Sequence, residues 1–168
     1  LLASSAASDV YKRQVGGFTF QIADLWWGGQ GNNRYFHYGN KDTDHHFEAG
    51  VSYALPCEKF PLSMAWYTVF AGDDENADGK RQYSSYAEFN YPFSVKGIAL
   101  NATLGLVPYK SMSAGLGYMT DGFAITNIAL KATKEIRLSS SFSLPLYAQV
   151  ICNPKMEDAH LVLGFTLR

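Results

Sequence analysis

The chain has 168 residues, which is enough for one domain. Its formal net charge of −1 gives no electrostatic basis for nucleic-acid binding, so we expect no nucleic-acid partner. Aromatic residues make up 15% of the sequence, and no run approaches the ~18 apolar residues of a membrane-spanning helix.

The start of the chain differs in character from the rest. Ser4–Gln14, SSAASDVYKRQ, resembles the in-frame translation of a transposase adaptor from a sequencing library at all eleven residues. A secretory signal is the alternative, but a signal carries its positive charge before its apolar stretch, whereas Lys12 and Arg13 follow the apolar start. We therefore expect residues 1–14 to be a non-native, disordered segment. Residues 15–168 are then an N-terminally truncated domain whose signal peptide is missing.

From Val15 onward, apolar residues recur at every second position, which is the period of a strand with one apolar face. Eight segments are predicted to be strands: Gly16–Trp27, His45–Leu55, Leu62–Gly72, Tyr83–Phe93, Gly97–Tyr109, Gly122–Ser139, Phe142–Asn153 and Ala159–Arg168. Most reach or exceed the roughly 9–11 residues that a tilted strand needs to cross a bilayer. The predicted fold class is all-β: an antiparallel up-and-down meander of about eight strands that forms a transmembrane β-barrel or a truncated part of one.

The connections between these segments alternate in length. Residues 28–44, 73–82 and 110–121 form long connections, 56–61, 94–96 and 140–141 form short ones, and 154–158 is intermediate. In a meander, alternate connections lie at the same end of the sheet, so the long ones share one end. Outer-membrane barrels have this asymmetry, with short periplasmic turns and longer extracellular loops.

Each predicted strand has one apolar and one polar face. The apolar face, which includes Phe20, Leu104 and Leu163, is expected to meet lipid, with Tyr and Trp gathered near the strand ends as interfacial girdles. Seven residues of the polar face are predicted to face the lumen: Glu48, Glu88, Asn101, Asn127, Lys131, Glu135 and Gln149. The four charged residues among them could form a paired-charge plug, line an aqueous path, or simply be solvated. Pro92 and Pro145 are expected to mark bulges or edges.

Four stretches carry a resemblance to the outer-membrane β-barrel proteins of Gram-negative bacteria, and more narrowly to TorF-like porins: ADLWWGGQG (23–31), YALPCEKFPLSMAWYTVFAG (53–72), YSSYAEFNYPFSVKG (83–97) and FAITNIALKATKEI (123–136). The resemblance implies further upstream strands and a location in the bacterial outer membrane. The expected partners are outer-membrane lipid, the barrel assembly machinery, and small polar solutes or ions. One departure is the ending GFTLR (164–168), since such barrels commonly finish on an aromatic assembly signal.

One loop resembles half of a calcium site. Asp74, Asn76 and Asp78, followed by Gly79, place oxygen ligands at alternate positions as in the first half of a calcium-binding loop. The twelfth position is Ser85 instead of a bidentate Glu. An acidic hairpin tip is therefore the favoured interpretation, with calcium as the weaker one and no other cofactor expected.

Two further patterns contain residue types that occur in metal, catalytic or phosphate sites. Asp42-Thr43-Asp44-His45-His46, with His37 nearby, could hold a metal or an Asp/His pair of a hydrolase, but adjacent His45 and His46 point to opposite faces of a strand. A polar loop rim is therefore favoured. Gly28-Gly29-Gln30-Gly31 lacks the Gly-Lys-Ser/Thr ending of a phosphate loop.

The predicted function is a passive porin-like channel or a structural barrel without catalytic activity. Cys57 and Cys152 fall at opposite ends of the predicted sheet, so no disulfide is expected. The alternative is a soluble, lipocalin-like barrel that binds an apolar small ligand. That fold needs the faces exchanged, with the Phe and Leu side chains inside and Glu88 and Lys131 outside.

Overall fold

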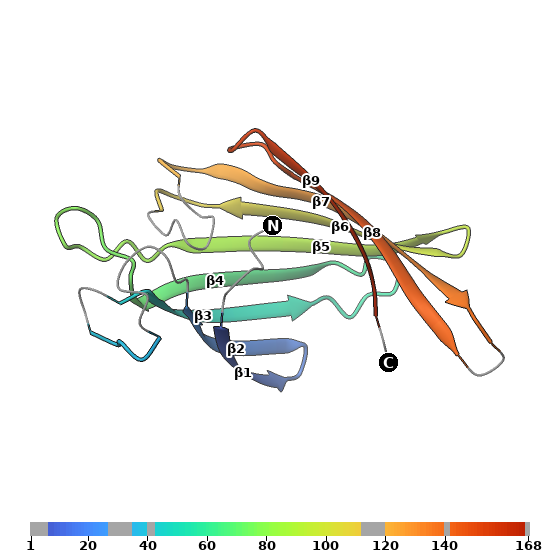
Figure 1. The fold of residues 1–168 in the computed structure, drawn as a ribbon, viewed down its shortest axis with the longest axis horizontal. Helices are drawn as coiled ribbons and strands as arrows, with labels where there is room; N and C mark the ends of the chain where they lie inside the picture. The colour runs from blue at the N-terminus through green and yellow to red at the C-terminus, as the bar shows by residue number, and fades with distance from the viewer. Residues whose placement is uncertain (1–6, 27–34, 40–42, 112–119, 140–141, 167–168) are drawn as a thin grey trace.

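The computed structural model describes residues 7–26, 35–39, 43–111, 120–139 and 142–166. These residues form one antiparallel sheet in the linear order β1 to β9, and the described parts of the chain contain no helix (Figure 1). The strands are β1 Ala7–Val15, β2 Phe18–Trp26, β3 His45–Ala54, β4 Ser63–Gly72, β5 Ser85–Val95, β6 Ile98–Val107, β7 Ala124–Arg137, β8 Ser143–Asn153 and β9 Asp158–Phe165. The topology is the predicted up-and-down meander. In the described parts, no helix has the length and apolar character needed to span a membrane.

The eight predicted segments all appear, as β2 to β9, with ends that shift by a few residues. The β5–β6 connection shows why the shifts occur. Val95 pairs with Ile98, and the two residues between them have positive φ, 50° at Lys96 and 77° at Gly97. This two-residue hairpin matches the right-handed twist of its strands, so the ladder extends beyond Phe93 to Val95. The long β4–β5 connection and the tight β5–β6 turn lie at opposite ends of the sheet (Figure 1).

Strand β1 is the main difference from the predicted fold. Ala7 to Val15 pair with β2 from Trp26 to Phe18, through a turn at Gly16-Gly17 in which Gly16 has a φ of 60°. Disorder is predicted for residues 7–14, and the structure instead shows a strand here. A strand can form without an apolar side-chain pattern, because the ladder hydrogen bonds join main-chain atoms. Residues 1–6 lie outside the described residues, and the adaptor origin of the segment stays a prediction.

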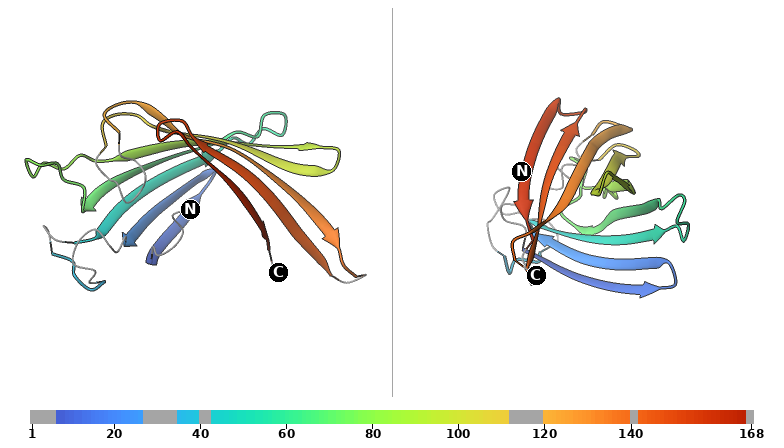
Figure 2. Two further views of the ribbon diagram at one scale, coloured as in Figure 1. Left: turned by 45° about the horizontal axis from the view of Figure 1, so that its top comes forward. Right: turned by 90° about the vertical axis from the view of Figure 1, so that its right-hand side faces the viewer.

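The sheet curves strongly but stays open. Figure 2 shows it as an arc with β1 and β9 at the two ends. Pairing of the first predicted strand with the last would close a barrel of eight strands, but β2 instead pairs with β1 on one side and with β3 on the other. Within the described residues, the outer edges of β1 and β9 therefore have no strand partner.

Of the two expectations for the prolines, bulges or edges, the structure shows local edges. Pro92 pairs opposite Asn101 and Pro145 opposite Glu135 in continuous registers, whereas the register shifts lie at Phe47/Glu48 and Gly105/Leu106. Pro92 lies beyond Asn90, where the β4 ladder ends, and Pro145 lies beyond Leu146, where the β9 ladder ends. One side of each proline therefore faces no paired strand, and on that side the missing amide hydrogen costs no ladder hydrogen bond.

The two faces of the sheet differ in exposure as well as in polarity. On the apolar face, Phe20 is 50% exposed, Leu104 38% and Leu163 71%. On the polar face, Glu48 is 5% exposed and Tyr86 8%. Side chains converge on the inside of a curved sheet and spread apart on its outside. The exposures thus place the polar face on the inside of the arc and the apolar face on the outside.

Candidate functional site

The polar inner face contains a hydrogen-bonded network centred on Glu88 in β5. The Glu88 carboxylate accepts hydrogen bonds from the Tyr86 hydroxyl at 3.0 Å and from Asn90 Nδ2 at 2.7 Å. Asn101 Nδ2 donates to Asn90 Oδ1 at 3.0 Å, and Asn127 Nδ2 donates to the Tyr86 hydroxyl at 3.2 Å. Three of the seven predicted lumen residues, Glu88, Asn101 and Asn127, are thereby joined across β5, β6 and β7.

A polar hollow of about 240 Å³ opens on this face beside the network. Its lining includes Glu88, Asn90 and Tyr67, together with Thr19 and Ser52 from β2 and β3. The lining offers one carboxylate among neutral hydroxyl and amide groups. Such a surface can hydrogen-bond water or small polar solutes, and it can favour a cation over an anion through Glu88.

Three tyrosine rings of the inner face each cover a glycine of a neighbouring strand. A side chain added at Gly50 would meet the Tyr67 ring at 2.6 Å, and one added at Gly105 would meet Tyr86 Cζ at 2.6 Å. Gly164 lies beneath the Tyr147 ring in the same way, with Cζ at 2.5 Å from the added atom. The absence of a Cβ at these glycines lets each ring lie flat on the sheet and fixes the position of its hydroxyl.

The other four predicted lumen residues lie on the same face but outside the Glu88 network. Glu48 is hydrogen-bonded by the Gln21 side chain, and Lys131 Nζ lies 4.2 Å from the centre of the Tyr147 ring. Gln149 pairs opposite Lys131, whereas Glu135 is exposed near the end of β7. Among the described residues, the ion pairs join none of the four predicted charged residues to one another, so the interpretation as a paired-charge plug finds no support.

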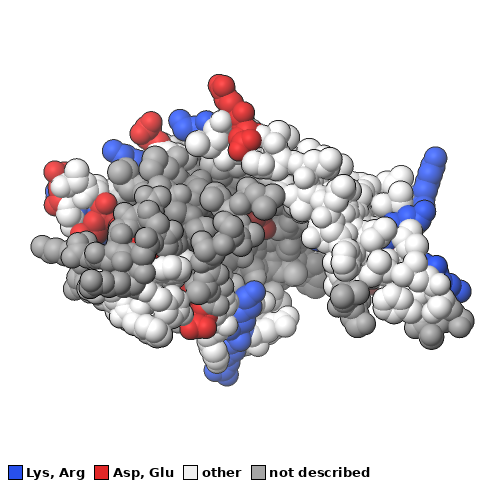
Figure 3. All heavy atoms as spheres, in the orientation of Figure 1, with Lys and Arg blue, Asp and Glu red and all other residues white. Residues whose placement is uncertain are grey.

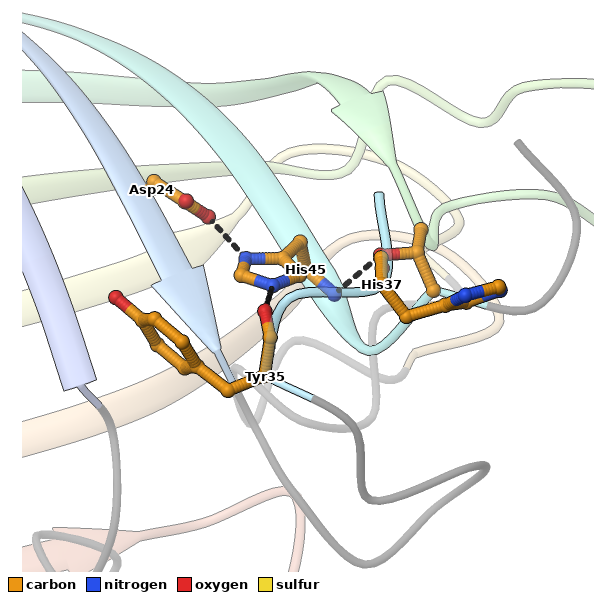
Figure 4. A network of polar contacts seen from close by, with 5 residues as sticks. Asp24, Tyr35, His37 and His45 are labelled. Carbon is orange, nitrogen blue, oxygen red and sulfur yellow. Dashed lines mark hydrogen bonds and ion pairs between the residues drawn. The ribbon is translucent and has the colours of Figure 1, made fainter. Parts of the chain in front are cut away.

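A second polar cluster lies at the long-loop end of β2 and β3. The His45 ring is fully buried, with Nδ1 at 2.7 Å from Asp24 Oδ1 and Nε2 at 2.5 Å from the Tyr35 carbonyl oxygen (Figure 4). Each ring nitrogen therefore has one oxygen partner, a carboxylate on one side and a main-chain carbonyl on the other. Within the described residues, the hydrogen-bond partners of the ring are these two oxygens and no hydroxyl or thiol, so the hydrolase pair, the less favoured alternative, gains no support here.

Aromatic rings cover the His45–Asp24 pair. Tyr38 stacks on His45 with ring centres 4.2 Å apart, and Tyr35 lies 5.5 Å away. Desolvation, followed by the nearby Asp24 carboxylate, raises the pKa of the Tyr38 hydroxyl above its ordinary value. Thr43 Oγ1 accepts from the His45 amide at 3.1 Å and donates to the His37 carbonyl oxygen at 2.8 Å. The cluster fastens the segment 35–39 to the sheet. Asp42 and Gly28–Gly31 lie outside the described residues.

The predicted half-calcium loop is a hairpin held by its own side chains. The buried Asp74 carboxylate accepts from the Ser84 amide at 3.0 Å and from the Ser84 hydroxyl. Asn76 Oδ1 accepts from the amides of Asp78 and Lys80 at 3.0 and 2.9 Å. Two of the three candidate ligands, Asp74 and Asn76, thus already accept hydrogen bonds from within the hairpin. Over the described parts of the chain, no group of three His, Cys, Asp or Glu side chains has a geometry that could hold a metal ion.

The two cysteines are free; Cys57 is exposed in the β3–β4 connection and Cys152 is half-buried in β8. The sequence pattern located the polar face but missed the partners that organise it. The hydrogen bonds that join Tyr86 and Asn90 to other strands, and the contact of the Tyr86 ring with Gly105, depend on the register. The one available signal was the presence of glycine at polar-face positions of predicted strands.

The fold and the site define an open, curved, nine-stranded antiparallel sheet with a polar inner face. The chain matches no protein-family model, and comparisons with curated proteins and with solved structures found no match.

Proposed function

We propose that the chain forms part of the wall of an outer-membrane β-barrel, as the resemblance to TorF-like porins implies, with a passive pore or structural role and without catalysis. The observation that carries this proposal is the outer face of the sheet. Large apolar side chains are exposed on every strand from β2 to β9, as with Phe20, Leu104 and Leu163. Contiguous apolar surface of this extent marks a contact with lipid or with another protein.

The distribution of charge supports the same proposal. Strands β4, β6 and β8 contain no Asp, Glu, Lys or Arg, and on the face drawn in Figure 3 the charged side chains gather mainly near the ends of the strands and along the β1 margin. A bilayer-spanning wall needs this arrangement, because a charge on the lipid face near the midplane costs about 2–4 kcal/mol for Lys or Arg. Strands of 8 to 14 residues, most of them 9 to 11, provide the required span.

The lipocalin-like alternative requires apolar side chains inside the curve and Glu88 and Lys131 outside. The inner face instead carries the network of Glu88, Asn90 and Asn101 and the stacked Lys131–Tyr147 pair, which would leave an apolar ligand without a dry cavity. We therefore favour the membrane proposal.

Purification and reconstitution test the proposal. We expect the protein to partition into detergent, to show heat-modifiable migration on gels and to insert into lipid vesicles. A monodisperse monomer in detergent-free buffer would contradict it. Planar-bilayer recording then separates the two roles. Single-channel current steps whose cation-over-anion selectivity falls when Glu88 is replaced by Gln identify a pore lined by the polar face. A protein that inserts but carries no current identifies a structural barrel.

A further inference from the structure

On the outer face of β4 to β9, the sheet has one charge in an otherwise apolar surface. The registers place Lys134 opposite Leu146, on the face that also carries Leu130 and Ile136. Every other Asp, Glu, Lys and Arg of β4 to β9 lies on the opposite face, so Lys134 is the single such charge on the outer face of these strands, all of which the structure describes. An isolated charge on a lipid-facing surface needs a polar partner at its depth.

Lys134 also lines an apolar groove on the outer face. The groove has a volume of about 620 Å³ and runs over β6 to β9. Ala132 and Ala148 pair across β7 and β8 and form its floor, because neither side chain extends beyond the methyl group. Leu163 and Phe165 border it on the β9 side and Ile98 on the β6 side. This apolar slot, with a cation in its lining, suits a lipid chain attached to an anionic head.

The depth of Lys134 fits a headgroup. It lies three residues before Arg137, the last residue of β7, which is roughly 10 Å along a strand. β6 begins at Ile98, one step beyond the Ala99–Thr133 pair, so Lys134 stands where the neighbouring strand starts. A lysine at this level can extend its ammonium group to the interface while its methylene chain stays on the apolar surface. Lys96 and Arg137 are exposed at the same end of the sheet.

We propose that this groove binds a phospholipid with an anionic phosphodiester headgroup, with one acyl chain on the Ala132–Ala148 floor and the phosphate at Lys134. The inference rests on the proposed function, because it assumes that the outer face meets lipid. The apolar walls favour a lipid over a free phosphate ion, and the attraction of Lys134 for a negative headgroup favours phosphatidylglycerol over phosphatidylcholine.

Native mass spectrometry of the full chain in dodecyl maltoside, with phosphatidylglycerol or phosphatidylcholine added, tests the proposal. We expect wild type to retain phosphatidylglycerol preferentially, and Lys134→Gln to reduce that retention about fivefold, the effect of one lysine at an anionic surface. Ala148→Leu, which fills the slot, should reduce retention of both lipids. Lys110→Gln removes an exposed lysine beyond β6, at the other end of the sheet, and should match wild type.

Unchanged selectivity in Lys134→Gln would overturn the proposal, as would displacement of the lipid by inorganic phosphate or the appearance of protein dimers in place of lipid adducts. Vesicle insertion is measured on the same samples. Insertion of all variants without lipid selectivity rejects the groove and leaves the proposed function standing. A wild-type protein that does not insert rejects the proposed function itself.

Discussion

The contact of Gly105 with Tyr86 gives the sharpest test of how the inner face is built. In Gly105→Ala the new methyl carbon would overlap the Tyr86 hydroxyl and come within 2.6 Å of Cζ, so the ring must move. The ring cannot move without breaking its hydrogen bonds to Glu88 at 3.0 Å and from Asn127 at 3.2 Å. A bond to a carboxylate contributes about 1.5–3 kcal/mol and a neutral one about 1 kcal/mol. We therefore expect a loss of about 2–4 kcal/mol in the free energy of unfolding.

A double-mutant cycle isolates this cause. Tyr86→Phe already lacks both hydrogen bonds, so Gly105→Ala should cost at least about 1 kcal/mol less in that background than in wild type. The measurement is urea unfolding from lipid vesicles, followed by tryptophan fluorescence. Gly122→Ala is the matched control, because an added Cβ at Gly122 meets no atom within 4 Å. A cost below about 0.5 kcal/mol for Gly105→Ala, or strict additivity in the cycle, would refute the reasoning.

Three further predictions concern the outer face, the His45–Asp24 pair and the acidic hairpin. Leu104→Arg should destabilise the vesicle-inserted protein by about 2–4 kcal/mol, whereas Gln149→Arg on the inner face should cost under about 1 kcal/mol; equal costs in urea unfolding would argue against a lipid-facing surface. His45→Ala should lower the free energy of unfolding by about 3 kcal/mol in the same assay, because Asp24 and the Tyr35 carbonyl lose their common partner. The control Asp121→Asn changes an exposed side chain and should be neutral. Asp74→Ala should lower the melting temperature by several degrees, because the Ser84 amide and hydroxyl lose their acceptor. EDTA should leave the melting temperature of the wild type unchanged, since Ser84 already occupies the Asp74 carboxylate. A clear shift on chelation would instead indicate a bound cation.

The strands could be predicted because their side chains alternate with a period of two. That pattern located β2 to β9 and assigned Glu88 and Leu104 to opposite faces, as the registers confirm. Contacts across strands could not be predicted, because they depend on register. The pairing of Gly50 with Tyr67 follows from a ladder that contains a bulge at Phe47/Glu48, and no local pattern in the sequence marks that bulge.

The segment most resistant to prediction was β1. Its side chains from Asp9 to Val15 are exposed, so packing contributes little, and the ladder to β2 holds it in place. β1 thereby covers the β2 edge that would otherwise be free to meet β9 in a barrel of eight strands. A free edge is a site of strand pairing that proteins rarely leave open, and any strand with compatible backbone can occupy it. If Ser4–Gln14 is adaptor-derived, the pairing of β1 with β2 needs no more than this compatible backbone.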